Sequence, residues 1–318
     1  MVSDIPTSEY VIWAYRLLLG REPETLDVVD NNPFVDRSAL VRHFVQSPEF
    51  AVNNGIGPSA RIGVGVHAGY SIYAALDDQL IGSPVYHGVY EPNVTDVFRR
   101  YLRRGMNVLD IGANIGHFTM VAASIVGPGG IVTAVEANPD NAKLLEASRL
   151  LNNFDFVRLI CAAAARDTGL MVLEMTGLNA RANPIQTSEQ LWLMRVTPSL
   201  PLRAVLPGDR PLDFVKMDIE GAEYNAVLGF IEILKRDRPV IVSEFAPSGL
   251  EQVSQVDGEV YLRLLRSLDL ELAVIELSGG VTWFGSDIAG VMAAFDASGS
   301  DHIDIIAAPP EQRDRLVG

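Results

Sequence analysis

Glycines and acidic residues follow the predicted strands of this chain, and these residue types can build a ligand site. A turn from Gly112 to Gly116 comes directly after the short apolar run from Met106 to Ile111. Its two glycines allow the backbone to approach a ligand closely, and the helix that follows offers free N–H groups. The spacing Gly-x-x-x-Gly differs from the Gly-x-Gly-x-x-Gly of dinucleotide-binding folds, so the turn alone is also compatible with a tight connection.

Glu136 ends the next predicted strand, about twenty residues after the glycine turn. A carboxylate at this place can accept hydrogen bonds from both hydroxyls of a ribose. The alternative is a solvated carboxylate at a strand end. A cavity lined by carboxylates suits a cationic cofactor better than a pyrophosphate, because like charges repel each other.

The elements that must position these residues alternate between strand and helix from residue 105 onward. Such alternation predicts βαβ units and a mostly parallel sheet, whose ligands bind beyond the carboxyl ends of the strands. A Pro-, Asn- and Thr-rich segment at about 163–210 is predicted to be an insertion at that edge, and residues 60–90 are predicted to form a β-hairpin. The predicted strands are 106–111, 131–135, 156–160, 214–218 and 239–245, with 270–277 and 303–307 closing the sheet.

The first fifty residues favour helices, because Tyr10, Trp13 and Leu17 follow the rhythm of one apolar helical face. A Gly-, Pro- and Asn-rich stretch from Asn53 to Pro58 predicts a domain boundary. We therefore expect a small all-helical domain at 1–52 and a larger α/β domain at 53–318.

Composition limits the class of protein. Hydrophobic residues make up 48% of the 318 residues and charged residues 20%, as in a globular protein. The formal net charge of -15 argues against a nucleic-acid partner. A single cysteine, Cys161, excludes an internal disulfide and a multi-cysteine metal site and fits the reducing cytoplasm. The one long uncharged stretch, Ile111 to Val135, holds five glycines and a proline, so no membrane span is expected.

Three runs together resemble FkbM-type S-adenosylmethionine-dependent methyltransferases: Asn107 to Gly116, Val135 to Pro139, and Val215 to Glu223. The resemblance covers about residues 85–310. It implies a Rossmann-like seven-stranded sheet whose last strand is antiparallel, and methylation of a hydroxyl on a sugar or glycan, a lipid or a natural product. Ala14 to Pro23 is similar to a small helical domain of unknown function, for which protein contact is the expected role.

The resemblance also implies cofactor-binding residues. The glycine turn would hold the methionine part of the cofactor, Glu136 the ribose, and the residues after the third strand the adenine. Asp110 would contact the cofactor's ammonium, and Glu91 occupies a family position near the cofactor, although a carboxylate facing a helix dipole explains Glu91 equally well. The full expected set is Glu91, Asp110, Gly112, Ala113, Asn114, Gly116, Glu136, Ala137, Cys161 and Ala162.

The acceptor chemistry needs a base or a metal ion, because an alcohol is barely ionised at neutral pH. Asp218, Glu220 and Glu244 lie at or after the ends of the fourth and fifth strands, and we expect them to be the catalytic residues. Asp218 and Glu244 would act as base and orienting group or would together hold Mg²⁺; we favour catalysis without a metal. Glu223 is expected to be a solvated residue of a first helical turn, and His117 to be structural.

Two other classes stay open at this point. A nicotinamide-dependent oxidoreductase would also use a glycine turn and a strand-end carboxylate, and a non-catalytic scaffold could keep the fold and bind a partner through residues 1–52. The insertion at 163–210 is expected to shape the acceptor pocket, where Asn179, Arg181 and Asn183 could bind sugar hydroxyls or simply form a polar loop.

Overall fold

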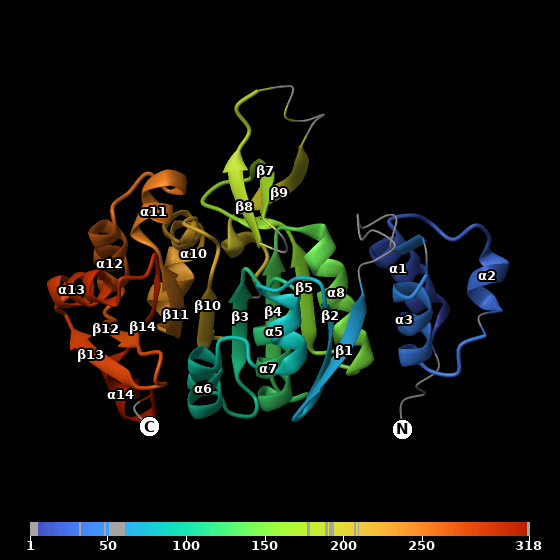
Figure 1. Ribbon diagram of the computed structural model, residues 1–318, viewed down its shortest axis with the longest axis horizontal. Coiled ribbons are helices and arrows are strands. Elements are labelled where there is room, and N and C mark those ends of the chain that lie inside the picture. Colours follow the sequence, from blue (N-terminus) through green and yellow to red (C-terminus); the bar gives the residue numbers. More distant parts are fainter. Residues whose placement is uncertain are drawn as a thin grey trace.

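A mixed β-sheet forms the centre of the molecule (Figure 1). The computed structural model describes residues 6–31, 33–47, 49–50, 61–176, 179–187, 190, 194–206, 208 and 210–316. In this part of the chain eight strands form the sheet in the order β13-β12-β14-β11-β10-β3-β4-β5. They are β3 (Asn107–Ile111), β4 (Ile131–Glu136), β5 (Val157–Cys161), β10 (Phe214–Met217), β11 (Val240–Phe245), β12 (Glu271–Ile275), β13 (Val281–Gly285) and β14 (Ile303–Ala308).

Five neighbouring strands, β5, β4, β3, β10 and β11, run parallel, and β14 runs antiparallel to both of its neighbours. This confirms the predicted Rossmann-like sheet with an antiparallel last strand. The eighth strand, β13, was not predicted; it pairs with the outer edge of β12. Only one neighbour holds β13, so its side chains are partly exposed and give little hydrophobic signal in the sequence.

Helices cover both faces of the sheet. On one face lie α6 (Pro92–Tyr101), α7 (His117–Val126) and α8 (Pro139–Leu151), and on the other α10 (Glu223–Asp237), α11 (Pro247–Val253), α12 (Gly258–Arg266) and α13 (Ile288–Ser298). Strand β10 contributes side chains to the cores on both faces of the sheet. Phe214 packs on the face covered by α6, α7 and α8, and Val215 packs on the opposite face. Lys216 therefore faces the same layer as Phe214, which contains α7.

The helices expected near the N-terminus are present as α1 (Ser8–Ala14), a π-helical turn η1 (Tyr15–Leu19), α2 (Leu26–Asp30) and α3 (Arg37–Val45). They lie at the β5 side of the sheet (Figure 1), where η1 and α3 pack on α8. Arg37 and Tyr10 both bind Asp155, at 3.1 and 3.0 Å. The predicted boundary between residues 52 and 53 falls outside the described residues, so the division into two domains stays a prediction.

The predicted hairpin is confirmed as β1 (Ile62–His67) and β2 (Tyr70–Ala75), followed by α5 (Gly82–His87). It is fastened to α8, because the N–H of Tyr73 donates to Ser148 Oγ at 2.9 Å and that of Ser71 to Asn152 Oδ1 at 2.7 Å.

The segment predicted to be an insertion folds into a separate sheet of four strands in the order β6-β9-β7-β8. It stands above the upper end of the main sheet (Figure 1). Its strands are β6 (Ala163–Ala164), β7 (Gly169–Thr176), β8 (Asn179–Pro184) and β9 (Arg195–Leu200). The remaining elements are η2 (Leu202–Ala204), η3 (Pro310–Gln312) and α14 (Arg313–Leu316). Among the described helices, none has the length and apolarity that a bilayer crossing requires.

Candidate active site

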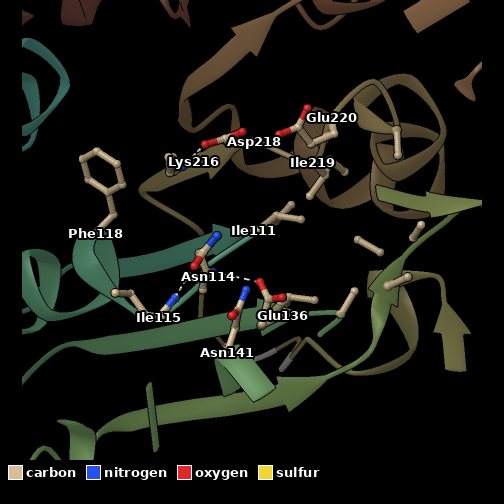
Figure 2. Close-up of a pocket in the computed structure, with 18 of the residues that line it drawn as sticks. Ile111, Asn114, Ile115, Phe118, Glu136, Asn141, Lys216, Asp218, Ile219 and Glu220 are labelled. Atoms are coloured by element: carbon tan, nitrogen blue, oxygen red, sulfur yellow. Dashed lines mark hydrogen bonds and ion pairs between the residues drawn. The ribbon is translucent and has the colours of Figure 1, made fainter. Parts of the chain in front are cut away.

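A cavity lies at the carboxyl ends of the central parallel strands, where the sequence places the candidate residues. Figure 2 shows Glu136 and Asn114 on one side of it and Asp218 and Glu220 on another. The insertion contributes Met171 of β7 and Ala182 of β8. The other lining residues are Ile81, Tyr90, Ile111, Gly112, Ala113, Ile115, His117, Phe118, Val135, Ala137, Asn141, Ala162, Ala163, Ala164, Lys216, Ile219 and Ala222.

The glycine turn forms one wall of the cavity. Gly112 has φ +80°, and a Cβ atom added there would clash with the backbone carbonyl of Asp218. Gly116 has φ +96°, and its added Cβ would lie 2.8 Å from Cγ of Leu145. Both positions therefore require glycine for conformation and for space. Of the turn residues expected to bind the cofactor, Gly112, Ala113 and Asn114 line the cavity, whereas Gly116 packs against α8.

Glu136 lines the cavity and also braces it. Its Oε2 accepts a hydrogen bond from the N–H of Asn114 at 2.8 Å, and its Oε1 accepts one from the N–H of Asn138 at 2.8 Å. Its exposed fraction is 5%. Burial raises the pKa of Glu136 to about 7, although these two hydrogen bonds act in the opposite direction. Ala137 also lines the cavity, as expected.

The predicted catalytic carboxylates gather at the other side of the site. Asp218 and Glu220 line the cavity, and Glu220 has a backbone φ of +57°. Glu244 is the next-to-last residue of β11 and lies outside the cavity lining, with its Oε1 4.0 Å from Nδ1 of His302. Burial, followed by the charge of Asp218, raises the pKa of Glu244 well above its ordinary value. The structure thus brings the three predicted acids together, with Asp218 and Glu220 in the cavity lining and Glu244 outside it.

Lys216 is a site residue that the sequence reasoning missed. Its Nζ lies 2.8 Å from Asp218 Oδ2 and 4.6 Å from the ring centroid of Phe118, and its exposed fraction is 5%. Burial lowers the pKa of Lys216, but the charges of Asp218, Glu91 and Asp110 raise it more strongly. A lysine inside the apolar run Phe214–Met217 was an available signal, because a buried cation requires partners.

Glu91 and Asp110 face Lys216 and do not line the cavity. Asp110 is fully buried, and its Oδ2 accepts a hydrogen bond from Thr119 Oγ1 at 2.6 Å. The expected direct contact between Asp110 and a cofactor ammonium therefore does not follow from this geometry. Glu91 is the N-cap residue of α6, with φ +37°, and burial raises its pKa to about 7.

The two residues expected beside adenine lie on different sides of the chain. Ala162 lines the cavity, whereas Cys161 is exposed and lines a second hollow together with Trp13 and Lys143. The expectation that Cys161 lies beside the cofactor is corrected accordingly.

Two further expectations concern His117 and Glu223. His117 is buried with its Nε2 3.2 Å from Thr95 Oγ1, and burial lowers its pKa to about 3, so it is neutral. Glu223 is also buried, and its Oε1 accepts hydrogen bonds from the N–H groups of Ile219 and Gly221. The expectation of a solvated Glu223 was wrong, because this carboxyl group braces the loop after β10. Within the described ranges, no three His, Cys, Asp or Glu side chains are grouped so as to hold a metal ion.

This strand order, with an antiparallel β14 and a cavity at the carboxyl edge, defines a Rossmann-like methyltransferase. The model of the Methyltransferase FkbM domain matches residues 110–271, which is half of the chain. The chain therefore belongs to the FkbM methyltransferase family. It is an S-adenosylmethionine-dependent methyltransferase, so the reading as a nicotinamide-dependent oxidoreductase is set aside.

Solved structures with similar folds include a methyltransferase FkbM from Methylobacillus flagellatus. It is 12% identical with a TM-score of 0.41, and the match covers 88% of this chain and 60% of that one. Another is Aeropyrum pernix fibrillarin in complex with S-adenosyl-L-methionine. It is 14% identical with a TM-score of 0.41, and the match covers 78% of this chain and 100% of that one. A comparison with curated proteins gave no match.

Proposed function

We propose that the protein transfers a methyl group from S-adenosylmethionine to a hydroxyl of a sugar or glycan, a lipid or a natural product. The observation that supports O-methylation most directly is Asp218 at the edge of the cavity. Lys216 binds only one of its oxygens, Oδ2, and the side chain is 25% exposed. A carboxylate held in this way has an oxygen left to accept the proton of an alcohol.

The lining of the cavity supports the proposed cofactor through its charges and its small side chains. Its acidic lining residues, Glu136, Asp218 and Glu220, complement a sulfonium cation. Small side chains at Ala162, Ala163 and Ala164 leave room for a flat adenine ring. We place the ribose at Glu136, the adenine beside Ala162, and the methionine part along the turn from Gly112 to Asn114.

The protein residues have a limited task in this reaction, since S-adenosylmethionine supplies a methyl group that its sulfonium has already activated. Asp218 accepts the hydroxyl proton at Oδ1 while Lys216 fixes Oδ2. We assign the orienting role to Glu244, whose raised pKa favours the protonated form and which lies near Asp218, outside the cavity lining. We favour this route over one with Mg²⁺, for which Asp218 and Glu244 would be the ligands, because an ammonium already occupies Asp218 Oδ2.

Calorimetry with S-adenosylhomocysteine tests the placement of the cofactor. We expect the wild type to bind and Glu136→Gln to bind at least about tenfold more weakly, the scale of a lost charge-assisted hydrogen bond. Glu223→Gln is the matched control, because Glu223 is an equally buried carboxyl group outside the cavity lining. Equal affinities of wild type and Glu136→Gln would refute the placement.

A mass-spectrometric screen of cell extracts incubated with the enzyme and S-adenosylmethionine tests the reaction. We expect a hydroxylated compound to gain one methyl group, with the same yield in the presence of EDTA. Methylation confined to nitrogen or sulfur atoms would contradict the proposal, and loss of activity with EDTA that Mg²⁺ restores would assign the metal route instead.

We further propose that the enzyme works in the cytoplasm, because its single cysteine, Cys161, is an exposed free thiol. Its net charge of -15 favours an acceptor other than nucleic acid. We assign the N-terminal helices at 1–52 to protein contact, a role supported by Trp13 of α1, which is 47% exposed.

A further inference from the structure

In the proposed reaction the ammonium of Lys216 has one task, which is to hold Asp218 Oδ2. Lys216 is one of three lysines in the chain, with Lys143 and Lys235. It is also the one lysine or arginine among the described residues that line the cavity. The methionine half of the cofactor carries one anionic group, its α-carboxylate. We propose that Lys216 binds this carboxylate, an inference that rests on the proposed placement of the cofactor.

The position of Lys216 supports this assignment. Strand β10 lies beside β3, and Lys216 pairs in register with Asp110, two residues before Gly112. The side chain of Lys216 therefore lies at the end of the cavity where the glycine turn begins. Aromatic rings close this end: Phe118 beneath the ammonium, and Tyr90, whose ring centroid is 5.5 Å from that of His117.

Lys216 has hydrogen-bonding capacity to spare. An ammonium carries three N–H donors, and within the described part of the chain one acceptor, Asp218 Oδ2, lies within hydrogen-bonding distance of Nζ. In a buried site an attraction between opposite charges is screened far less than in water. The other charged groups of the lining are the acids Asp218, Glu136 and Glu220, which would repel a carboxylate. Lys216 is therefore the charged lining residue that can attract the α-carboxylate.

Four acidic groups surround Lys216: Asp110 of β3, Glu91 ahead of α6, Asp218 after β10 and Asp304 of β14. Burial raises the pKa of Glu91 to about 7 and that of Asp304 to about 6, and it raises the pKa of Asp110 as well. These groups therefore hold protons more readily than ordinary carboxyl groups, which reduces the negative charge around Lys216.

A ligand pair isolates the carboxylate and needs no acceptor. S-adenosylhomocysteine carries the α-carboxylate, and S-adenosyl-3-thiopropylamine is the same molecule without it. By calorimetry, we expect Lys216→Met to lower the affinity for S-adenosylhomocysteine about 10- to 100-fold, the scale of a lost charge-assisted contact. We expect the same variant to bind the decarboxylated ligand as tightly as the wild type or more tightly, because an ammonium no longer faces its amine.

Controls separate this contact from a general effect on the fold. Lys235→Met removes a lysine with a similar ion pair, 2.9 Å to Glu232 on the surface, and should change neither affinity. Lys216→Gln keeps a hydrogen-bond donor for Asp218 and should show the same selective loss, so the test stands even if Lys216→Met does not fold. Lys216→Arg, which keeps the charge, should recover part of the affinity.

The possible failures are distinguishable. An equal loss of affinity for both ligands in Lys216→Met, or an unchanged affinity for S-adenosylhomocysteine, would overturn the assignment of Lys216. Weaker binding of S-adenosylhomocysteine by Glu136→Gln would still support the placement of the cofactor in that case. If Glu136→Gln binds S-adenosylhomocysteine like the wild type, the placement itself is wrong, and this inference falls with it.

Discussion

At the scale of single residues, the site contrasts two carboxylates. Glu136 accepts hydrogen bonds from two backbone N–H groups, and its position is fixed by the turn and by the start of α8. Asp218 is held by Lys216 through one oxygen, so its other oxygen can act on a second molecule. A rigid acceptor suits binding, and a partly free carboxylate suits proton transfer.

The substitution Asp218→Asn tests this division. An amide cannot accept the proton, so we expect turnover to fall about 100-fold or more, the scale of a lost general base. Affinity for S-adenosylhomocysteine should stay within about threefold, since the shape of the side chain is kept. Initial rates and calorimetry measure the two quantities. A comparable loss of binding and turnover would place Asp218 on the cofactor side of the site.

The raised pKa of Glu136 predicts how cofactor binding depends on pH. With a pKa of about 7, Glu136 is mostly protonated at pH 6 and mostly ionised at pH 8. The ionised form is the better acceptor for ribose hydroxyls, so affinity for S-adenosylhomocysteine should rise about three- to tenfold over this range. Calorimetry at both values, with Glu136→Gln beside the wild type, measures the effect. The variant should lack this increase, and a wild-type affinity independent of pH contradicts the prediction.

Sequence reasoning located some site residues and misjudged others for identifiable reasons. Glu136 and Asp218 were found because they lie at and directly after a strand end, where backbone direction alone brings a side chain to the ligand edge. Lys216 was overlooked because it lies inside a strand, and only the three-dimensional packing reveals which acids surround it. Cys161 was placed on the wrong side because the direction of its side chain depends on where β5 ends.

At the scale of elements, the glycine turn joins β3 to α7 and passes closely beside β10. The N–H groups of Gly112 and Ala113 donate to the carbonyl oxygen of Val135, at 2.9 and 3.1 Å, and that of Asp218 to Ile111 at 3.0 Å. The ends of three strands, β3, β4 and β10, therefore meet at this turn. At Gly112 the neighbouring backbone leaves no room for a side chain.

Gly112→Ala should destabilise the protein for two separate reasons, a left-handed backbone and a clash with the carbonyl of Asp218. We expect a loss of at least about 2 kcal/mol in the free energy of unfolding, measured by urea denaturation. Gly279→Ala is the control, because Gly279 has φ +86° but no atom within 4 Å of its added Cβ. In Gly279→Ala the free energy of unfolding should fall only by the cost of the left-handed backbone, about 1 kcal/mol. Equal losses would mean that the clash is relieved by a small movement.

The main parallel strands were predictable because each is a short apolar run followed by a turn and a helix. The fold of the segment at 163–210 was not predictable, since its three longest strands, β7, β8 and β9, pair within their own sheet and do not alternate with helices. Its apolar run from Leu191 to Met194 lies largely outside the described residues. The prediction that this segment shapes the acceptor pocket stays open.

At the scale of the whole molecule, buried acids dominate the response of stability to pH. Burial raises the pKa values of Glu91, Glu136 and Glu223 to about 7. Between the ordinary carboxyl pKa of about 4.5 and 7, the folded protein binds more protons than the unfolded chain, so stability falls as pH rises. His117, with a lowered pKa, acts in the opposite direction, but chiefly below pH 6.5.

We therefore expect the thermal unfolding midpoint to rise by roughly 3 °C or more when the pH is lowered from 8 to 6. Scanning calorimetry at the two values measures the change. Glu223→Gln should reduce it, because the amide can still accept the hydrogen bonds of Ile219 and Gly221 but does not titrate. A midpoint that is constant or falls toward pH 6 would show that these carboxyl groups do not control stability.

The burial of Lys216 has a consequence for chemical derivatisation. The exposed fractions of the three lysine side chains are 48% for Lys235, 15% for Lys143 and 6% for Lys216. An acylating reagent should therefore modify Lys235 first, on the surface of α10, and reach Lys216 last. The enzyme can thus be tethered to a resin or given a fluorophore through a lysine amine while its cavity stays chemically unaltered.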